Sequence, residues 1–146
     1  MHRRTFLRTG STLTAASLLM PSTSLFAATQ PKFSLNYAPH PGTFKSKGGE
    51  AYLDQVRFAA DQGFTAWEDN GIKRQTPEMQ EKIGAELARL GMTMGVFVAY
   101  GSFDRPTFVR KDKATWDEIT RTVTASVAVA TRVRATWMTV VPGSVD

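Results

Sequence analysis

The 146-residue chain contains no cysteine, which excludes disulfide bonds, thiolate metal sites and cysteine nucleophiles. No apolar run reaches the roughly 18 residues that a membrane-spanning helix needs. Histidine is almost as scarce, because only His40 lies outside the first few residues, and this excludes a zinc site built on a histidine pair. The glycine-rich phosphate loops and the Gly-x-Ser-x-Gly elbow of serine hydrolases are missing too.

The N-terminal segment has the pattern of an export signal. Arg3 and Arg4 precede Phe6, a mildly apolar run follows over residues 11–20, and small residues come at the end. The paired arginines are typical of the twin-arginine route. We therefore expect residues 1–27 to be a twin-arginine-type signal peptide and the protein to be exported or periplasmic.

The basic character of the chain comes partly from this segment. The chain has 18 Lys and Arg against 13 Asp and Glu, a net charge of +5. Three of the arginines lie in residues 1–27, so residues 28–146 carry 15 basic and 13 acidic side chains, a net charge of +2. The remaining basic residues are scattered and form no stripe, which argues against nucleic acid as a partner. No membrane association is expected once the signal is removed.

Strand-like and helix-like segments alternate along residues 28–146. The predicted strands cover residues 33–38, 65–68, 93–100 and 136–141. Alternation of this kind is typical of an α/β fold with a parallel sheet. The run over residues 93–100 is almost continuously apolar, as expected for a strand that is covered on both faces.

Three helices are predicted between these strands. The first covers residues 50–62, and residues 45–49 before it are expected to be loop. The second opens with Thr76 as N-cap and ends at Gly91, and the third opens with a capping box in which Thr115 caps the helix and Glu118 lies three residues later. Trp67, Trp116 and Trp137 are expected to pack between helices and sheet.

Arg134 breaks a pattern at the helix ends. Gly63 and Gly91 follow the first two helices, where a left-handed residue is common, and Arg134 takes the corresponding place after the third. A left-handed backbone at a residue with a Cβ costs about 1–2 kcal/mol. Either this helix ends differently or the position is mildly strained.

Polar residues follow the predicted strands, where ligands of parallel α/β folds bind. Asn36 and His40 follow the first strand, and Glu68 ends the second behind an apolar tryptophan, so we expect its carboxylate to face a cleft. Asp69 and Asn70 are interpreted as turn formers. The substrate-binding candidates are therefore Asn36, His40 and Glu68, and no acid–base pair is complete.

Three stretches resemble one protein family. They are Phe33-Ser34-Leu35-Asn36-Tyr37-Ala38-Pro39-His40, Gln62-Gly63-Phe64-Thr65-Ala66-Trp67-Glu68 and Met138-Thr139-Val140-Val141-Pro142-Gly143. They look like the hydroxypyruvate isomerase-like branch of the xylose-isomerase-like TIM barrels, which includes sugar phosphate isomerases and epimerases. The resemblance implies the N-terminal half of a (β/α)8 barrel, with four parallel strands in sequential order and three helices over residues 28–146.

The resemblance also implies a chemistry. Family members move a proton between adjacent carbons of a small hydroxy-carbonyl compound or sugar through an enediolate, using paired glutamates from later strands. Many hold a divalent metal through Glu, Asp and His of their second half. Both catalytic bases and the metal ligands would lie beyond Asp146, so no catalytic or metal-binding residue is predicted here and the cofactor stays open. Arg134 departs from the family, where a small residue is usual.

Three interpretations remain open at this point. In the first, the chain is part of an exported isomerase and is inactive alone. In the second, it is a non-catalytic ligand-binding half-barrel. In the third, it is a complete small doubly wound α/β protein. A four-stranded fragment would leave two strand edges and an inner sheet face uncovered. We therefore expect self-association through open strand edges, besides a small-molecule substrate as partner.

Overall fold

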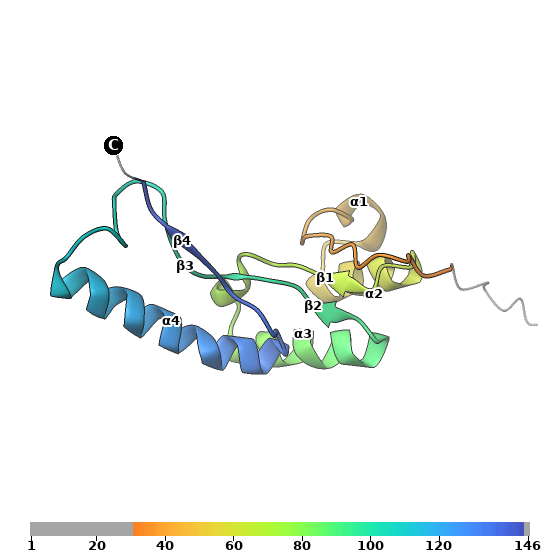
Figure 1. The fold of residues 1–146 in the computed structure, drawn as a ribbon. Helices are drawn as coiled ribbons and strands as arrows, with labels where there is room; N and C mark the ends of the chain where they lie inside the picture. Colours follow the sequence, from red (N-terminus) through yellow and green to blue (C-terminus); the bar gives the residue numbers. More distant parts are fainter. Residues whose placement is uncertain (1–30, 145–146) are drawn as a thin grey trace, which may run out of the picture.

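The computed structural model describes residues 31–144, an α/β arrangement of helices and short parallel strands (Figure 1). The predicted signal peptide, residues 1–27, lies outside the described residues. One end of the molecule is compact and holds helices α1 to α3 with strands β1 and β2. From this end a longer arm extends, in which helix α4 lies under the strands β3 and β4. None of the helices in the described part is long and apolar enough to cross a membrane.

The strands form two separate parallel pairs. Strand β1 (Ala66–Trp67) pairs with β2 (Thr93–Met94), and β3 (Val98–Ser102) pairs with β4 (Thr139–Pro142). Neighbours in each pair are consecutive along the chain and parallel. The α/β class is thereby confirmed, but the described residues form two small sheets and no closed barrel, so the continuous four-stranded sheet that was predicted is not seen.

The first predicted strand, residues 33–38, does not form. Its backbone makes one hydrogen bond toward the sheet region, from Phe33 N to Gly63 O at 2.9 Å. It also bends on itself, because Tyr37 N donates to Leu35 O at 2.9 Å. The side chains of Leu35 and Tyr37 are exposed. The alternating apolar residues of this segment therefore do not form the buried face of a strand. The segment still reaches β1 at its far end, where Glu68 N donates to Pro39 O.

The third predicted strand is interrupted, and each part pairs with a different neighbour. Gly95 N still donates to Trp67 O at 2.7 Å, which extends the β1–β2 pairing by one bond. Thr139 N then donates to Phe97 O at 2.9 Å, and β3 continues alongside β4 with a register shift between Val98 and Tyr100. The run at 93–102 therefore passes from one sheet to the next.

The helices follow local sequence signals closely at the compact end. Helix α3 (Pro77–Leu90) begins where predicted, with the Thr76 hydroxyl accepting from Met79 N, and ends at Gly91, which has a left-handed φ of 66°. Helix α2 (Tyr52–Asp61) fills most of the predicted 50–62. The predicted loop before it contains a short helix, α1 (Lys45–Gly48), and the loop after β1 contains a 3-10 turn, η1 (Ile72–Arg74).

Helix α4 (Lys113–Val133) starts earlier than predicted, and the capping box at Thr115 is wrong. Asp112 is the N-cap, and its carboxylate accepts from Thr115 N at 2.9 Å. Glu118 is bound instead by Arg105. At the other end Arg134 has a φ of 59°, so the residue does occupy the left-handed region.

The core lies between the first sheet and the helices that pack on it. Trp67 is fully buried, together with Ile83 of α3, and Val133 brings the end of α4 into the same cluster. Helices α3 and α4 approach closely, because a Cβ on Gly84 would lie 2.2 Å from the Arg132 carbonyl oxygen. Trp116 and Trp137 are 44% and 71% exposed, so the prediction that they pack inside is wrong.

Candidate functional site

The best-formed polar constellation lies at the carboxyl end of β1. Trp67 is held inside by a hydrogen bond from its Nε1 to the Tyr52 hydroxyl, at 2.9 Å. The Tyr52 hydroxyl in turn donates to Asp69 Oδ2 at 3.0 Å, and Asp69 Oδ1 accepts from Gly71 N at 2.7 Å. Burial and the nearby Asp69 carboxylate raise the pKa of Tyr52, so this hydroxyl remains protonated. The network fixes the loop that follows β1, as the turn-forming role predicted for Asp69 requires.

A cleft of about 440 Å³ lies beside β1 and β2. Of the three predicted site residues, Asn36 and Glu68 line it. Of the described residues that line the cleft, Glu68 is the one with a titratable side chain. The complete lining is Asn36, Ala38, Ala66, Glu68, Thr93, Met94, Gly95, Val96, Thr136 and Trp137.

His40 joins this cluster through Glu68. Its Nε2 lies 3.7 Å from Glu68 Oε1, within ion-pair distance when the imidazole is protonated. The Glu68 side chain is 25% exposed and also accepts a hydrogen bond from Asn70 Nδ2 at 3.3 Å. Asn36 is anchored by the Thr65 hydroxyl, which donates to its Oδ1 at 2.9 Å and leaves the amide NH2 for other partners. The three residues predicted from the sequence therefore lie together, although the strand expected to carry Asn36 is not formed.

The donor set of this cluster suits hydroxyl and carbonyl groups better than a metal ion. Glu68 accepts hydrogen bonds, the Asn36 amide donates them, and His40 can do either. Within residues 31–144, no three His, Asp or Glu side chains come together in a way that could hold a metal. One carboxylate with one exposed imidazole is an incomplete ligand set, so the divalent metal of the resembling family does not fit these residues.

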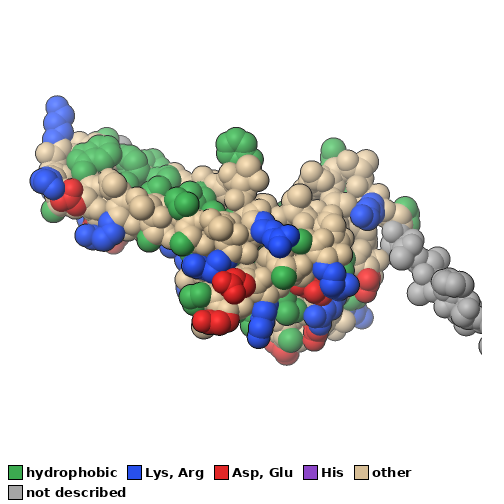
Figure 2. Space-filling model, turned by 90° about the horizontal axis from the view of Figure 1, so that it is seen from below, with side chains coloured by type: hydrophobic (Ala, Val, Ile, Leu, Met, Phe, Trp, Pro, Cys, Tyr) green, Lys and Arg blue, Asp and Glu red, His purple; other side chains and the backbone are tan. Residues whose placement is uncertain are grey.

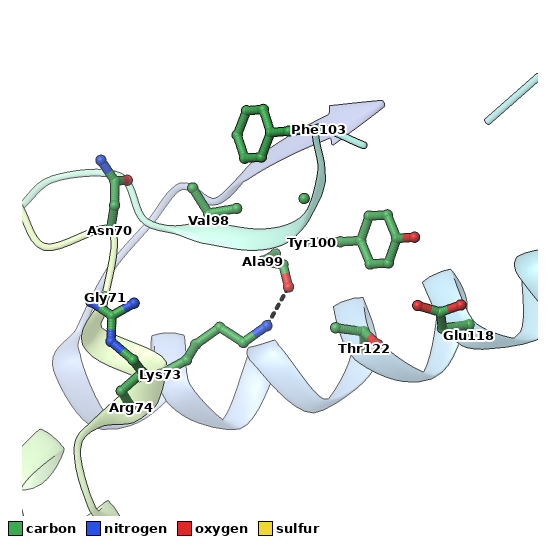
Figure 3. Close-up of a pocket in the computed structure, with 11 residues that line it drawn as sticks. Asn70, Gly71, Lys73, Arg74, Val98, Ala99, Tyr100, Phe103, Glu118 and Thr122 are labelled. Atoms are coloured by element: carbon green, nitrogen blue, oxygen red, sulfur yellow. Dashed lines mark hydrogen bonds between the residues drawn. The ribbon is translucent and has the colours of Figure 1, made fainter. Parts of the chain in front are cut away.

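A second pocket, of about 490 Å³, lies between η1, β3 and α4 (Figure 3). Lys73 and Arg74 of η1 form one wall, while Tyr100 on β3 and Glu118 on α4 form another. Figure 3 shows the Lys73 side chain reaching across to the Ala99 carbonyl, to which its Nζ donates. Asn70 lines this pocket and bonds to Glu68 of the cleft, so the two sites adjoin.

Sequence reasoning missed Lys73 and Arg74 as site residues. They belong to the strand-to-helix loop, but they come three and four residues after Asn70, the last of the polar residues that directly follow the strand. The available signal was a consecutive Lys–Arg pair between a turn-forming Asn-Gly and a helix cap. The Tyr100 ring packs against Phe108 at a centroid distance of 6.1 Å.

Comparison of the chain with family models, with curated proteins and with solved structures found no match.

Proposed function

We propose that these residues form one wall of the substrate site of an exported isomerase that resembles hydroxypyruvate isomerase. The substrate would be a small hydroxy-carbonyl compound or sugar. The observation that carries the proposal is that Asn36 and Glu68 line one cleft beside the carboxyl end of β1, with His40 Nε2 3.7 Å from Glu68 Oε1. Ligands of parallel α/β folds bind at that end of the strands.

In this reaction class a proton leaves the carbon next to a carbonyl, an enediolate forms, and the proton returns to the neighbouring carbon. Glu68 would accept a hydrogen bond from a substrate hydroxyl, and the free Asn36 NH2 would donate to a carbonyl or hydroxyl oxygen. His40, at the exposed lip, would hold a second oxygen. Glu68 is the one carboxylate on the described lining, and proton transfer between two carbons needs further groups, so binding and orientation are the roles assigned here.

A calorimetric titration of the full chain with hydroxypyruvate tests this proposal. We expect saturable binding that Glu68→Gln weakens about tenfold or more, since a hydrogen bond to a charged group contributes about 1.5–3 kcal/mol. Glu81→Gln is the matched control, because Glu81 is an exposed glutamate on α3 away from the cleft. Equal affinity in all three proteins, or no binding, would refute the role of the cleft.

A non-catalytic binding module is the second candidate, and the single carboxylate of the cleft favours it. Binding of an enediolate mimic separates the two functions, because the cleft holds one carboxylate and turnover by this chain alone is not expected. A planar hydroxamate that binds more tightly than hydroxypyruvate, and loses this advantage in Glu68→Gln, supports the isomerase. Equal or weaker binding of the hydroxamate supports the binding module.

Export by the twin-arginine route is part of the proposal and rests on Arg3 and Arg4, which precede the described residues. Replacing both with lysine should leave the protein unprocessed in the cell interior. Export of the double variant at the normal rate would contradict this route.

A further inference from the structure

The pocket in Figure 3 carries more positive charge than its surroundings neutralise. Lys73 and Arg74 are consecutive residues of η1 that both line it. Neither forms an ion pair with a carboxylate of residues 31–144. The one carboxylate on the lining, that of Glu118, is already held by Arg105 Nη2 through both oxygens, at 3.0 and 2.9 Å. The pocket therefore has two uncompensated cations.

Lys73 is held in place before any ligand arrives. Its ammonium donates one hydrogen bond to the Ala99 carbonyl oxygen, which the Ser126 hydroxyl also contacts at 3.2 Å. Two of the three ammonium protons remain for another acceptor. Partial burial lowers the pKa of Lys73, because it disfavours the charged ammonium, although the residue as a whole remains exposed. A bound anion would favour the charged form.

The position of the Arg74 side chain depends on the small size of Gly71. Its guanidinium lies over the backbone of Gly71, where an added Cβ would come within 2.1 Å of Nη2. Gly71 has a φ of −98°, which any residue can adopt, so its lack of a side chain matters here for space alone. An alanine at this position would displace the guanidinium while keeping its charge.

Two further donors line the same pocket, although the Tyr100 ring points away from Lys73 and Arg74 (Figure 3). The Tyr100 hydroxyl is buried and is the one buried side-chain polar atom of the described residues that has no hydrogen-bond partner. The Asn70 amide uses one hydrogen on Glu68 and has a second to offer. A volume of about 490 Å³ lies within the range of small-molecule sites.

We propose that this pocket binds the oxyanion group, carboxylate or phosphate, of a small molecule through Lys73 and Arg74. A lysine supplies a compact charge and an arginine a planar fork, and both recognise oxyanions. The inference concerns other side chains than the isomerase proposal. Hydroxypyruvate itself carries a carboxylate, so its binding at this pocket would be weakened by Lys73→Met, whereas its binding at the cleft would be weakened by Glu68→Gln.

Titration of the full chain with inorganic phosphate, and separately with acetate, followed by NMR, tests this inference. We expect saturable shifts of the Gly71, Lys73 and Tyr100 amides. The anion that binds with the lower dissociation constant identifies the group that the pocket prefers. Lys73→Met and Arg74→Gln should each weaken binding about tenfold or more. Lys82→Met is the matched control, since Lys82 is an exposed lysine on α3 that forms no ion pair within the described residues.

Gly71→Ala separates the geometry of the site from its charge. The variant keeps Lys73 and Arg74 but moves the guanidinium, so it should weaken phosphate binding several-fold with the fold unchanged by circular dichroism. It also keeps the inference testable if Lys73→Met fails to fold. No saturable binding of either anion in the millimolar range, or equal weakening by Lys82→Met, would overturn the inference.

Discussion

The compact end and the arm use the same alternation of strand and helix but are covered to different degrees. At the compact end Trp67 is fully buried and hydrogen-bonded to Tyr52. On the arm, Phe103, which follows β3, is 80% exposed. In Figure 2, hydrophobic side chains gather along the arm, whereas charged side chains of both signs cover the compact end and the tip of the arm.

The difference shows what a parallel strand pair needs in order to be buried. Strands β1 and β2 are packed by side chains of α2 and α3, with the end of α4 closing the cluster. Of the helices α1 to α4, α4 lies along strands β3 and β4 (Figure 1), and most residues of β4 are exposed. Parallel sheets are stable when both faces are covered. The compact end should therefore carry most of the folding free energy, and the arm most of the surface available to a partner.

The largest contrast is expected between a buried tryptophan and an exposed phenylalanine. Trp67→Ala removes a fully buried side chain with its hydrogen bond and should lower the free energy of unfolding by about 3–5 kcal/mol. Phe103→Ala, on the arm, should change it by less than about 0.5 kcal/mol. Urea unfolding of both variants measures the difference. Similar losses would mean that the two regions are packed alike.

A smaller effect is expected at Glu86, which joins α2 to α3. Hydrogen bonds from Arg89, and then from Arg57, lower the pKa of this nearly buried carboxyl from 4.5 to about 2. Glu86→Gln should cost about 1–2 kcal/mol at neutral pH. A depressed pKa gives stability that is fully present above 4.5 and is lost as the pH falls toward 2.

The check is urea unfolding of wild type and Glu86→Gln at several pH values from about 7 to about 3. This range includes the ordinary pKa of a glutamate in an unfolded chain. The gap between the two proteins should shrink below about pH 4.5. Glu81→Gln serves as the exposed control on the same helix. A gap that stays constant with pH would show that the ion pairs of Glu86 contribute nothing.

Arg134 should give a modest gain of stability. Glycine relieves about 1–2 kcal/mol of left-handed strain but adds freedom to the unfolded chain, so Arg134→Gly should stabilise by about 0.5–1 kcal/mol. Arg121→Gly, at an exposed position inside α4, should instead destabilise by about 1 kcal/mol. Thermal unfolding of both variants measures the gain in stability at Arg134 and the loss at Arg121. A loss of stability in Arg134→Gly would show that the arginine side chain makes a contact that outweighs the strain.

The smallest effect on stability, but a clear one on association, is expected at β4. One side of β4 pairs with β3, and within residues 31–144 no strand pairs with its other side. We expect a mass in solution that rises with concentration, and Val140→Lys should suppress this rise. Val127→Lys, exposed on α4, is the control that tests whether any added charge has the same effect. A wild-type chain that is monomeric at every concentration would contradict association through this edge.

The parts of the fold that depend on local chemistry were predictable from the sequence. Thr76-Pro77 and Gly91 delimit α3 because capping needs only neighbouring residues. The start of α4 was predicted wrongly because the sequence offers two possible N-caps. The Asp112 carboxylate accepts a hydrogen bond from Thr115 N, in the way that the Thr115 hydroxyl was expected to accept one from Glu118 N. Residues 33–38 alternate as a strand does, but a strand also needs a partner over its whole length, and sequence alternation alone does not supply one.

The candidate site was predictable to a similar extent. Asn36, His40 and Glu68 could be grouped because each follows a predicted strand, and they do lie together. The pocket of Lys73 and Arg74 could not be predicted, because it depends on the separation of β3 from the first sheet. No local pattern in the apolar run at 93–100 indicates where it changes partner.

The most direct test of the cleft as a ligand site is the amide NMR spectrum of the full chain during titration with hydroxypyruvate. The largest shifts should fall on Glu68 and on Gly95, whose backbone lies against the Glu68 side chain. Amides in the middle of α4 should stay unchanged. Shifts confined to the arm, or a spectrum that does not respond at all, would contradict the assignment of substrate binding to the carboxyl end of β1.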